Sequence, residues 1–220
     1  MDKEKFLKAS GVILETLYDE FTSLPILNFT ELDKDKTALI IVDMINGFVK
    51  EGALSSPQMA SLTPEIVKLT KKFKNEKLKI VALADNHPED SVEFCAYPPH
   101  CIKGTSESFV IDELQEVGGY ELIEKNSTNG FLEPTFQDWL SSHPEIDTFI
   151  ITGGCTDICV LQLALTLKMH FNRLNKKTRI IVPTNGVNTY DLGTHFSSLM
   201  HLFALYNMRL NDIEIVKEVK

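Results

Sequence analysis

Apolar residues along the chain follow two patterns that alternate. Short continuous runs rich in Ile, Val and Thr predict strands, at residues 37–44, 78–84, 120–124, 148–152, 179–183 and 212–216. Between most of these runs, apolar residues recur at helical spacing, at residues 64–74, 132–141, 160–174 and 194–207. Buried strands that alternate with helices are typical of a parallel sheet with helices on both faces. The sequence therefore predicts an α/β fold, a three-layer α/β/α sandwich around a mainly parallel six-stranded sheet.

The first 35 residues precede this alternation and predict an amphipathic helix followed by a proline-containing connection. The apolar side chains that would share one face of the helix are Phe6, Ile13, Leu14, Leu17, Tyr18 and Phe21. Such a helix would cover the sheet or contact another subunit. With 220 residues, 43% of them hydrophobic, the chain suffices for one sizeable core. We therefore expect a single domain over residues 1–220, with residues 1–35 as a helical extension.

Composition narrows the range of partners. The 22 basic and 31 acidic residues give a formal charge of −9, which repels phosphate backbones and anionic membranes. We expect neither nucleic acid nor a membrane as a partner. No apolar run approaches the roughly 20 residues of a membrane span, and the N-terminus lacks a basic-then-apolar signal pattern. We expect a cytoplasmic protein whose four cysteines are thiols; a homo-oligomer is left open.

Chemically reactive side chains follow four of the predicted strands. Asp43 ends the first strand, Asp85 and His87 follow the second, Lys125 follows the third, and a Gly-Gly-Cys turn leads from the fourth to Cys159. In an open parallel sheet, the carboxyl ends of the strands meet at one edge, where ligands bind. The sequence therefore predicts that a carboxylate, a pair of metal-ligand candidates, an ammonium group and a thiol lie close together.

Cys159 is the candidate nucleophile. It falls in the first turn of a predicted helix with Thr156 as the expected N-cap, and the free N–H groups of a helix start favour a thiolate. The same N–H groups could hold the oxyanion that forms when the thiolate attacks a carbonyl. Asp43 follows the apolar run ALIIV and needs a partner, which Lys125 could be. An aspartate beside the thiol could accept its proton and return it to a leaving amine.

Three other interpretations stay open. Cys155 could be a small buried hydrophobe, as free cysteines often are, and Asp43 with Lys125 could be a structural ion pair. Cys155 and Cys159 are four residues apart and could form a redox pair. A binding protein without catalytic activity is also compatible with the sequence. A dinucleotide-binding dehydrogenase fits poorly, because no G-x-G-x-x-G follows the first strand.

The residues around these positions resemble the motifs of the isochorismatase-like cysteine hydrolases, and among them the nicotinamidases. The resemblance rests on IIVDMINGF, EKNSTNGF and GGCTDICV and extends from about residue 37 to the C-terminus. It implies the isochorismatase-like hydrolase fold, with Asp43 as acid and base, Lys125 as its charge partner and Cys159 as nucleophile. It also implies an oxyanion hole formed by the backbone N–H groups of Cys155 and Cys159, and a cis peptide bond just before Cys155.

A second segment, ADNHPEDSVEFCAYPPHCIKGT, resembles the metal site of nicotinamidases. The resemblance implies four ligands, Asp85, His87, Glu93 and His100. Two imidazoles with carboxylate oxygens suit a divalent metal, zinc first and otherwise manganese or iron. In nicotinamidases this metal binds the pyridine nitrogen of the substrate while the amide faces the thiol. The alternative is a solvated loop whose acidic residues are surface charge.

Two aromatic residues complete the predicted site. Phe48 and Tyr97 occupy positions where the family places rings around the flat substrate, although either could belong to the core. The resemblance implies hydrolysis of nicotinamide to nicotinate and ammonia through a thioester on Cys159. The alternative is a related cysteine hydrolase that acts on another amide or carbamoyl compound. An isochorismatase is less favoured, because its chemistry uses neither a catalytic cysteine nor such a metal loop.

Overall fold

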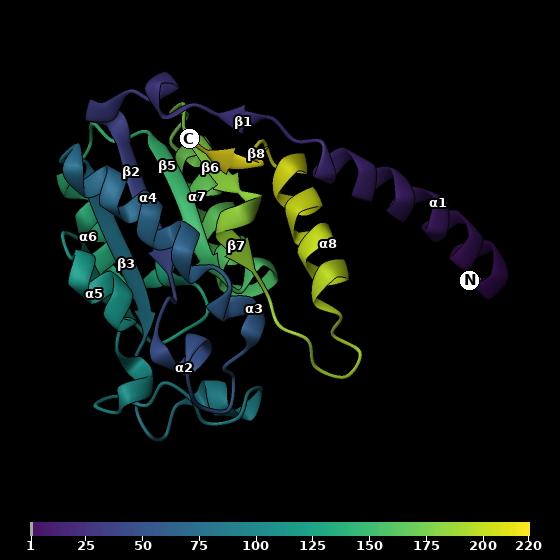
Figure 1. The fold of residues 1–220 in the computed structure, drawn as a ribbon, viewed down its shortest axis with the longest axis horizontal. Coiled ribbons are helices and arrows are strands. Elements are labelled where there is room, and N and C mark those ends of the chain that lie inside the picture. Colours follow the sequence, from purple (N-terminus) through teal and green to yellow (C-terminus); the bar gives the residue numbers. More distant parts are fainter. Residues whose placement is uncertain (1) are drawn as a thin grey trace.

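The computed structural model describes residues 2–220 and contains the predicted parallel sheet (Figure 1). Its main strands lie in the order β4-β3-β2-β5-β6-β8, and each neighbouring pair is parallel. Their bounds are β2 Thr37–Val42, β3 Lys79–Asp85, β4 Glu121–Lys125, β5 Thr148–Gly154, β6 Arg179–Pro183 and β8 Glu214–Val216. These are the six predicted strands. The sheet has a seventh, β7 (Val187–Asn188), which pairs with β5; a strand of two residues leaves no periodic pattern in a sequence.

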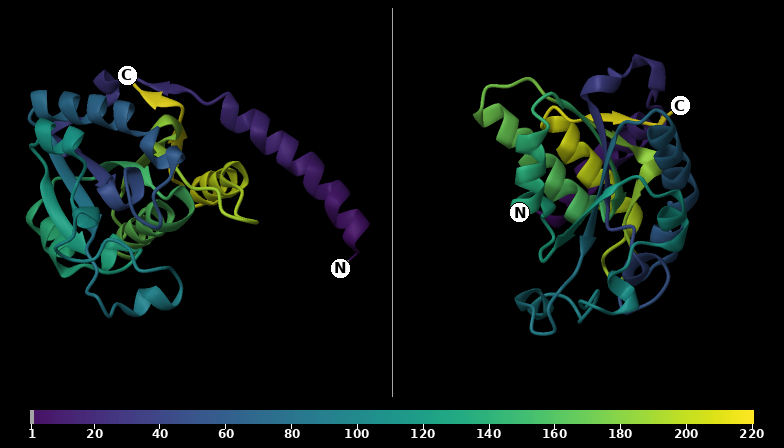
Figure 2. Two further views of the ribbon diagram at one scale, coloured as in Figure 1. Left: turned by 60° about the horizontal axis from the view of Figure 1, so that its bottom comes forward. Right: turned by 90° about the vertical axis from the view of Figure 1, so that its left-hand side faces the viewer.

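Helices cover both faces of the sheet, as the sequence predicts for a three-layer sandwich (Figure 2). Their bounds are α1 Lys3–Thr22, α2 Asn46–Val49, α3 Pro57–Ala60, α4 Thr63–Asn75, α5 Asp112–Val117, α6 Pro134–Ser142, α7 Leu161–Arg173 and α8 Ser197–Leu210. Side chains of β2 alternate between the two layers, because successive strand residues point to opposite faces. Ala38, Ile40 and Val42 pack in one core with α6, α7 and α8, and Leu39 and Ile41 pack in the other with α4 and α5.

The strand register brings the carboxyl ends of four strands together. Val42, the last residue of β2, lies beside Leu83 of β3 and Gly153 of β5, and Asp85 lies beside Lys125 of β4. Glycine is required at position 153, where φ is +110° and an added Cβ would lie 1.9 Å from the Val42 carbonyl oxygen. The close approach of β2 and β5 at this point positions the turn that follows β5.

Helix α1 projects away from the sheet (Figure 1 and Figure 2). Of its residues only Leu17 and Phe21, near the C-terminal end, are buried, where the helix contacts α8. After α1, the strands β1 (Ile26–Leu27) and β9 (Glu218–Val219) form a small parallel sheet. The predicted N-terminal helix is thus present but does not cover the main sheet. Among residues 2–220, no helix combines the length and the apolar composition needed to cross a membrane.

Candidate active site

Three charged side chains from neighbouring strands meet at the carboxyl edge of the sheet. Asp43 follows β2 in a left-handed backbone conformation, with φ at 53°, which Asp tolerates better than most residues. Lys125 Nζ lies 2.9 Å from Asp43 Oδ2 and also donates a hydrogen bond to Asp85 Oδ1. Asp43 Oδ1 accepts a hydrogen bond from the Asp85 backbone N–H at 3.1 Å. Each of the three residues is 1% exposed, so each charge depends on the others for compensation.

Cys159 lies against this ion-pair network. Its Sγ is 3.9 Å from Lys125 Nζ and within 4.8 Å of a carboxylate oxygen of Asp43 and of Asp85. The structure therefore brings together the three residues for which the sequence predicts the catalytic roles, Asp43, Lys125 and Cys159. Their chemical roles remain predictions.

The turn that carries the nucleophile candidate differs from the predicted helix start. Residues Thr156–Val160 form a π-helix, η6, between β5 and α7. The predicted N-cap is wrong, because the Thr156 hydroxyl is hydrogen-bonded to His201 Nδ1 at 2.9 Å and Cys155 occupies the cap position. The peptide bond between Gly154 and Cys155 is cis, as the resemblance implied. The oxyanion hole expected at this turn remains a prediction.

The surroundings of Cys159 oppose the thiolate that the sequence analysis expects. Burial raises the pKa of Cys159 well above its usual range; the Lys125 ammonium lowers it, and the carboxylates of Asp43 and Asp85 raise it. Burial raises the thiol pKa more than the N–H groups of a helix start lower it in a more exposed turn. These surroundings favour the protonated thiol, so attack of the sulfur on a substrate is expected to need a base that accepts the proton.

Asp43 is suited to accept that proton. Burial and the neighbouring Asp85 carboxylate together raise the pKa of Asp43 to about 7, although Lys125 opposes the rise. Burial lowers the pKa of Lys125, but the charges of Asp43 and Asp85 outweigh this effect and hold it well above its usual range. The ammonium thus stays charged, while a carboxyl group with a pKa near neutrality can both accept and release a proton.

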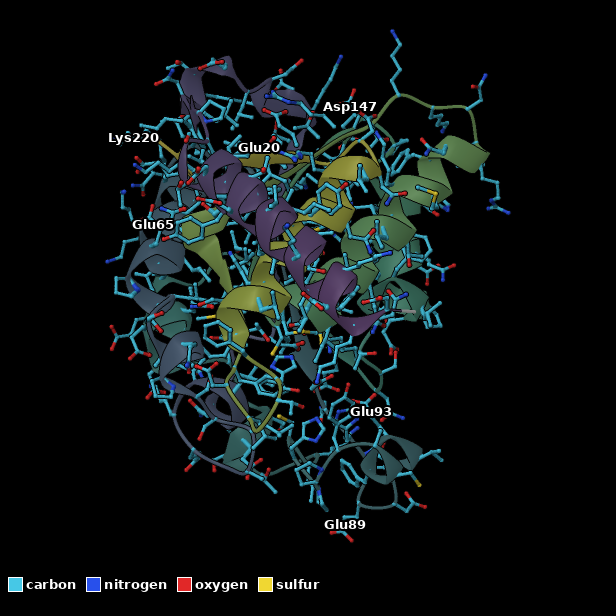
Figure 3. All side chains as sticks on the ribbon, turned by 90° about the vertical axis from the view of Figure 1, so that its right-hand side faces the viewer. Glu20, Glu65, Glu89, Glu93, Asp147 and Lys220 are labelled. Atoms are coloured by element: carbon cyan, nitrogen blue, oxygen red, sulfur yellow. The ribbon has the colours of Figure 1, made fainter. Side chains whose placement is uncertain are left out.

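The four predicted metal ligands converge beside the ion-pair network. One ligand atom from each of Asp85, His87, Glu93 and His100 lies within 4.8 Å of the others. His87 Nε2 is 3.5 Å from Asp85 Oδ1, and His100 Nε2 is 3.9 Å from Asp85 Oδ2. Separations of this size are expected for ligand atoms that share one ion at bond lengths of about 2.0–2.2 Å. Glu89, in the same loop, lies exposed at the outer end of the molecule, beyond Glu93 (Figure 3).

Hydrogen bonds orient both imidazoles for metal binding. His87 Nδ1 is 2.9 Å from Asn126 Oδ1, and His100 Nδ1 is 2.8 Å from the Pro98 carbonyl oxygen. Because both partners are acceptors, each Nδ1 carries the proton and each Nε2 turns a lone pair toward the centre of the cluster. His87 Nε2 is buried and has no hydrogen-bond partner, which costs free energy unless a cation binds it. The residues therefore fit a divalent metal ion.

A narrow cavity joins the thiol and the metal-ligand cluster. The residues that line it are Phe48, Leu54, Asp85, Glu93, Tyr97, His100, Thr128, Cys155, Ile158, Cys159 and Tyr190. The predicted aromatic residues Phe48 and Tyr97 are both among them, and their ring centres lie 5.6 and 6.2 Å from that of His100. Four lining residues were not predicted: Leu54, Thr128, Ile158 and Tyr190. Thr128 and Ile158 lie within the motifs EKNSTNGF and GGCTDICV, which could have indicated them, whereas Leu54 and Tyr190 lie in neither.

Tyr190 is held in the cavity wall by contacts with the nucleophile turn. Its ring stacks on that of His195, with ring centres 4.2 Å apart, and its carbonyl oxygen accepts from His195 Nδ1 at 2.8 Å. His195 Nε2 lies 2.8 Å from Asp157 Oδ2 in η6. Burial lowers the pKa of His195, but the hydrogen bond to Asp157 raises it above its usual value. An Asp157–His195–Tyr190 chain thus couples the loop after β7 to the turn of Cys159.

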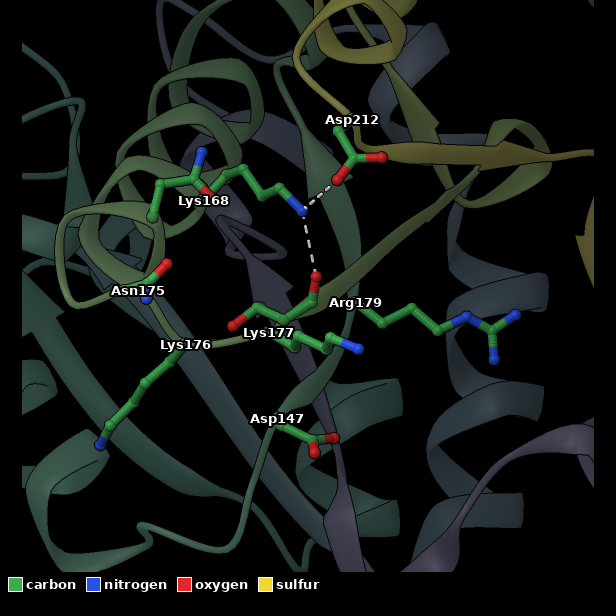
Figure 4. Close-up of a pocket in the computed structure, with 9 residues that line it drawn as sticks. Asp147, Lys168, Asn175, Lys176, Lys177, Arg179 and Asp212 are labelled. Atoms are coloured by element: carbon green, nitrogen blue, oxygen red, sulfur yellow. Dashed lines mark hydrogen bonds and ion pairs between the residues drawn. The ribbon is translucent and has the colours of Figure 1, made fainter.

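Another surface cavity lies at the opposite edge of the sheet (Figure 4). It measures about 690 Å³ and is formed by residues at the amino ends of β5, β6 and β8 and by α7. Lys168 in this cavity is paired with Asp212 at 2.6 Å and donates to the Thr178 carbonyl oxygen at 3.1 Å. The lining residues include neither cysteine nor histidine. We therefore place the candidate active site in the smaller cavity, which both reactive groups face.

Known proteins share this architecture. The fold is the isochorismatase-like α/β fold, which solved structures of amidases also have. The chain belongs to the isochorismatase domain family, whose sequence pattern matches residues 37–210.

Individual relatives extend the similarity over most of the chain. Nicotinamidase 1 of Arabidopsis thaliana is 28% identical over an alignment of 238 residues. The alignment includes 93% of this chain and 97% of the relative. The structure of N-carbamoylsarcosine amidase from Thermoplasma acidophilum is 27% identical, covers 83% of this chain and 96% of its own, and has a TM-score of 0.69. Pyrazinamidase of Pyrococcus horikoshii, solved in complex with zinc, is 26% identical, covers 83% and 99%, and has a TM-score of 0.68.

Proposed function

We propose that this protein is a metal-containing cysteine amidohydrolase that converts nicotinamide to nicotinate and ammonia and acts in NAD salvage. The chain is a hydrolase of amide C–N bonds, as its family and relatives indicate; the proposal concerns its substrate and the residues that act. One observation carries it. The thiol of Cys159 and the metal-ligand cluster face the same narrow cavity, so a flat substrate could meet both at once.

The ion-pair network would supply the acid–base chemistry. As Cys159 Sγ bonds to the amide carbon, Asp43 accepts the thiol proton, and the oxyanion is held by the N–H groups of Cys155 and Cys159. Asp43 then gives the proton to the amide nitrogen, the C–N bond breaks and ammonia leaves a thioester on Cys159. Water attacks the thioester and transfers a proton through Asp43 to the sulfur as the acid leaves. Lys125 keeps the carboxylates of Asp43 and Asp85 compensated throughout.

The metal-ligand cluster would fix the other end of the substrate. Asp85, His87, Glu93 and His100 would hold a zinc ion, which when bound offers a Lewis-acid position for the pyridine nitrogen. Zinc is favoured over manganese or iron by the two imidazole nitrogens and by the similarity to a pyrazinamidase solved with zinc. Phe48, which lies in the cavity next to His100, would contact the ring.

A carbamoyl amidase is the second candidate. It is favoured by the similarity to N-carbamoylsarcosine amidase, with a TM-score of 0.69. An aliphatic carbamoyl substrate has no aromatic nitrogen to place on a metal, so the cluster of two histidines and two carboxylates favours nicotinamide.

Ammonia release tests the proposal directly. Zinc-loaded protein is incubated with nicotinamide, pyrazinamide or N-carbamoylsarcosine, and nicotinamide is expected to be hydrolysed. Cys159→Ala should lower the turnover by at least about 10³-fold, as removal of a nucleophile does, whereas Cys95→Ala, at an exposed cysteine, should leave it unchanged. Release from N-carbamoylsarcosine alone would support the second candidate. No release from nicotinamide or pyrazinamide would refute the proposed substrate.

A further inference from the structure

Helix α1 carries an apolar stripe that is covered only at one end. Leu17 and Phe21 are buried in the core that contains α8, whereas Phe6, Leu7 and Ile13 are 50%, 57% and 57% exposed. Spacings of seven, four and four residues relate Phe6, Ile13, Leu17 and Phe21, and Leu7 precedes Phe21 by fourteen residues, so these five side chains lie on one side of the helix. The stripe therefore continues from a packed interface within the chain into solvent.

The N-terminal half of α1 gains little from its own chain. Apart from the adjacent residues and backbone of α1 itself, no described atom lies within 4 Å of a Cβ placed at Gly11, and a glycine within a helix costs about 1 kcal/mol relative to alanine. A helix of this length without tertiary contacts is only marginally stable in water. A partner that covers the exposed stripe would stabilise this half of the helix.

The charges of α1 indicate which partner fits. Its first half has a net positive charge, from Lys3, Lys5 and Lys8 against Glu4, and its second half is acidic, through Glu15, Asp19 and Glu20. This order is unfavourable within one helix, because the helix dipole favours acidic residues at the N-terminus and basic ones at the C-terminus. Beside an antiparallel second copy the same order is favourable, because the basic half of each helix lies next to the acidic half of the other. An anionic membrane fits less well, because α1 has four acidic against three basic residues and the chain has a charge of −9.

Helix α8 lies beside α1 (Figure 1 and Figure 3), and further exposed apolar side chains lie on α8 and at its start. Phe203 and Leu210 of α8 are seven residues apart and 46% and 66% exposed, and Phe196, the N-cap residue that precedes the helix, is 59% exposed. Residues seven apart share one face of a helix. Each copy thus offers an exposed apolar helix start and an exposed apolar helix face, which is what a two-fold symmetric contact requires.

We propose that two copies of this chain associate through α1 in an antiparallel, two-fold arrangement, with the outer face of α8 in each copy covering the exposed start of the partner's α1. None of the exposed apolar residues named for this contact lines the cavity of Cys159, and the proposal does not depend on the proposed activity. It accounts for the exposed apolar residues and for the order of charges along α1.

Sedimentation velocity on the full chain at concentrations from about 1 to 100 µM tests this arrangement. The wild-type chain is expected at twice the protomer mass of 24.8 kDa. Ile13→Glu places a charge in the stripe and should weaken association at least 10-fold. Val12→Glu is the matched control, because Val12 is 63% exposed on the opposite side of α1 and should leave the dimer intact. A wild-type monomer at all concentrations, or equal effects of the two variants, would overturn the proposal.

Two further measurements separate the alternatives. In a mixture of isotope-labelled and unlabelled protein, zero-length cross-links between copies should join lysines of residues 3–8 to acidic residues 15–20. Links confined to Glu4 would instead indicate parallel helices and overturn the arrangement. Flotation of wild-type monomers with anionic phosphatidylserine vesicles, lost in Ile13→Glu, would show that α1 binds a lipid surface rather than a second copy.

Discussion

Replacement of the buried lysine tests whether the ion-pair network is a coupled unit. Lys125 is the cation that compensates both Asp43 and Asp85 in the described structure, at 2.9 Å from Asp43 Oδ2 and in direct contact with Asp85. Lys125→Met keeps most of the side-chain volume and removes the charge. Removing one partner of a buried ion pair costs about 3–5 kcal/mol. For a chain of this size that corresponds to a fall in Tm of about 6–20 °C.

The cost should depend on pH in a defined direction. Burial would raise the pKa of Asp85, but Lys125 and His87 hold it below its usual value, so the wild-type carboxyl is ionised from pH 5 to 8. Without Lys125, the folded variant must bind one more proton in this range, on Asp85 or on His87. Because the folded variant then holds one proton more than wild type, its free energy of unfolding should fall relative to wild type as the pH rises, by up to about 1.4 kcal/mol per pH unit.

Urea unfolding at pH 5, 6, 7 and 8, with metal chelated so that no cation replaces the ammonium, measures this cost. The double variant Asp43→Asn/Lys125→Met removes one of the two carboxylates and should regain part of the stability, but none of the turnover. A Lys125→Met protein as stable as wild type at pH 8, or a cost that is the same at pH 5 and pH 8, would refute the assigned coupling.

Three further predictions concern positions around the site. Gly153→Ala should destabilise the fold by at least about 4 kcal/mol in urea unfolding, because the added Cβ meets a backbone oxygen at 1.9 Å; Gly104→Ala, also at positive φ but in open space, should cost only about 1–2 kcal/mol. Burial lowers the pKa of His201 to about 4, so as the pH falls this imidazole is protonated in the unfolded chain before it is protonated in the folded one. The free energy of unfolding should therefore fall by up to about 3 kcal/mol between pH 6.5 and pH 4. His201→Asn should abolish that part of the pH dependence; an unchanged pH profile would contradict the assignment. His195→Ala releases Tyr190 from the cavity wall and should raise KM for nicotinamide about 10-fold with little change in kcat, and an unchanged KM would argue against this role.

The fold follows from the sequence because its signals are local and strong. Most buried strands are continuous apolar runs, as in TALIIV of β2, and β2, β3 and β4 end at or just before charged residues that the parallel register brings to one edge. The ionisation of Cys159 could not be predicted in this way. It depends on complete burial and on two carboxylates from distant segments, which no local pattern records. Tyr190 was missed for the same reason, since its place in the cavity wall depends on His195 and Asp157.

Asp85 joins the two halves of the candidate site. Its Oδ1 accepts from Lys125, and its two oxygens also face His87 and His100 at 3.5 and 3.9 Å. His100→Ala removes a ligand without touching the ion-pair network, so it should lower zinc affinity at least about 10-fold and leave the iodoacetamide alkylation rate of Cys159 unchanged. Asp85→Asn should change both quantities, because Lys125 then keeps only one carboxylate. Zinc content after dialysis and the alkylation rate are measured on the same samples. An equal effect of His100→Ala and Asp85→Asn on the alkylation rate would show that the ion-pair network and the metal-ligand cluster do not act separately. The assignment of separate roles to the thiol and to the metal ligands would then be refuted.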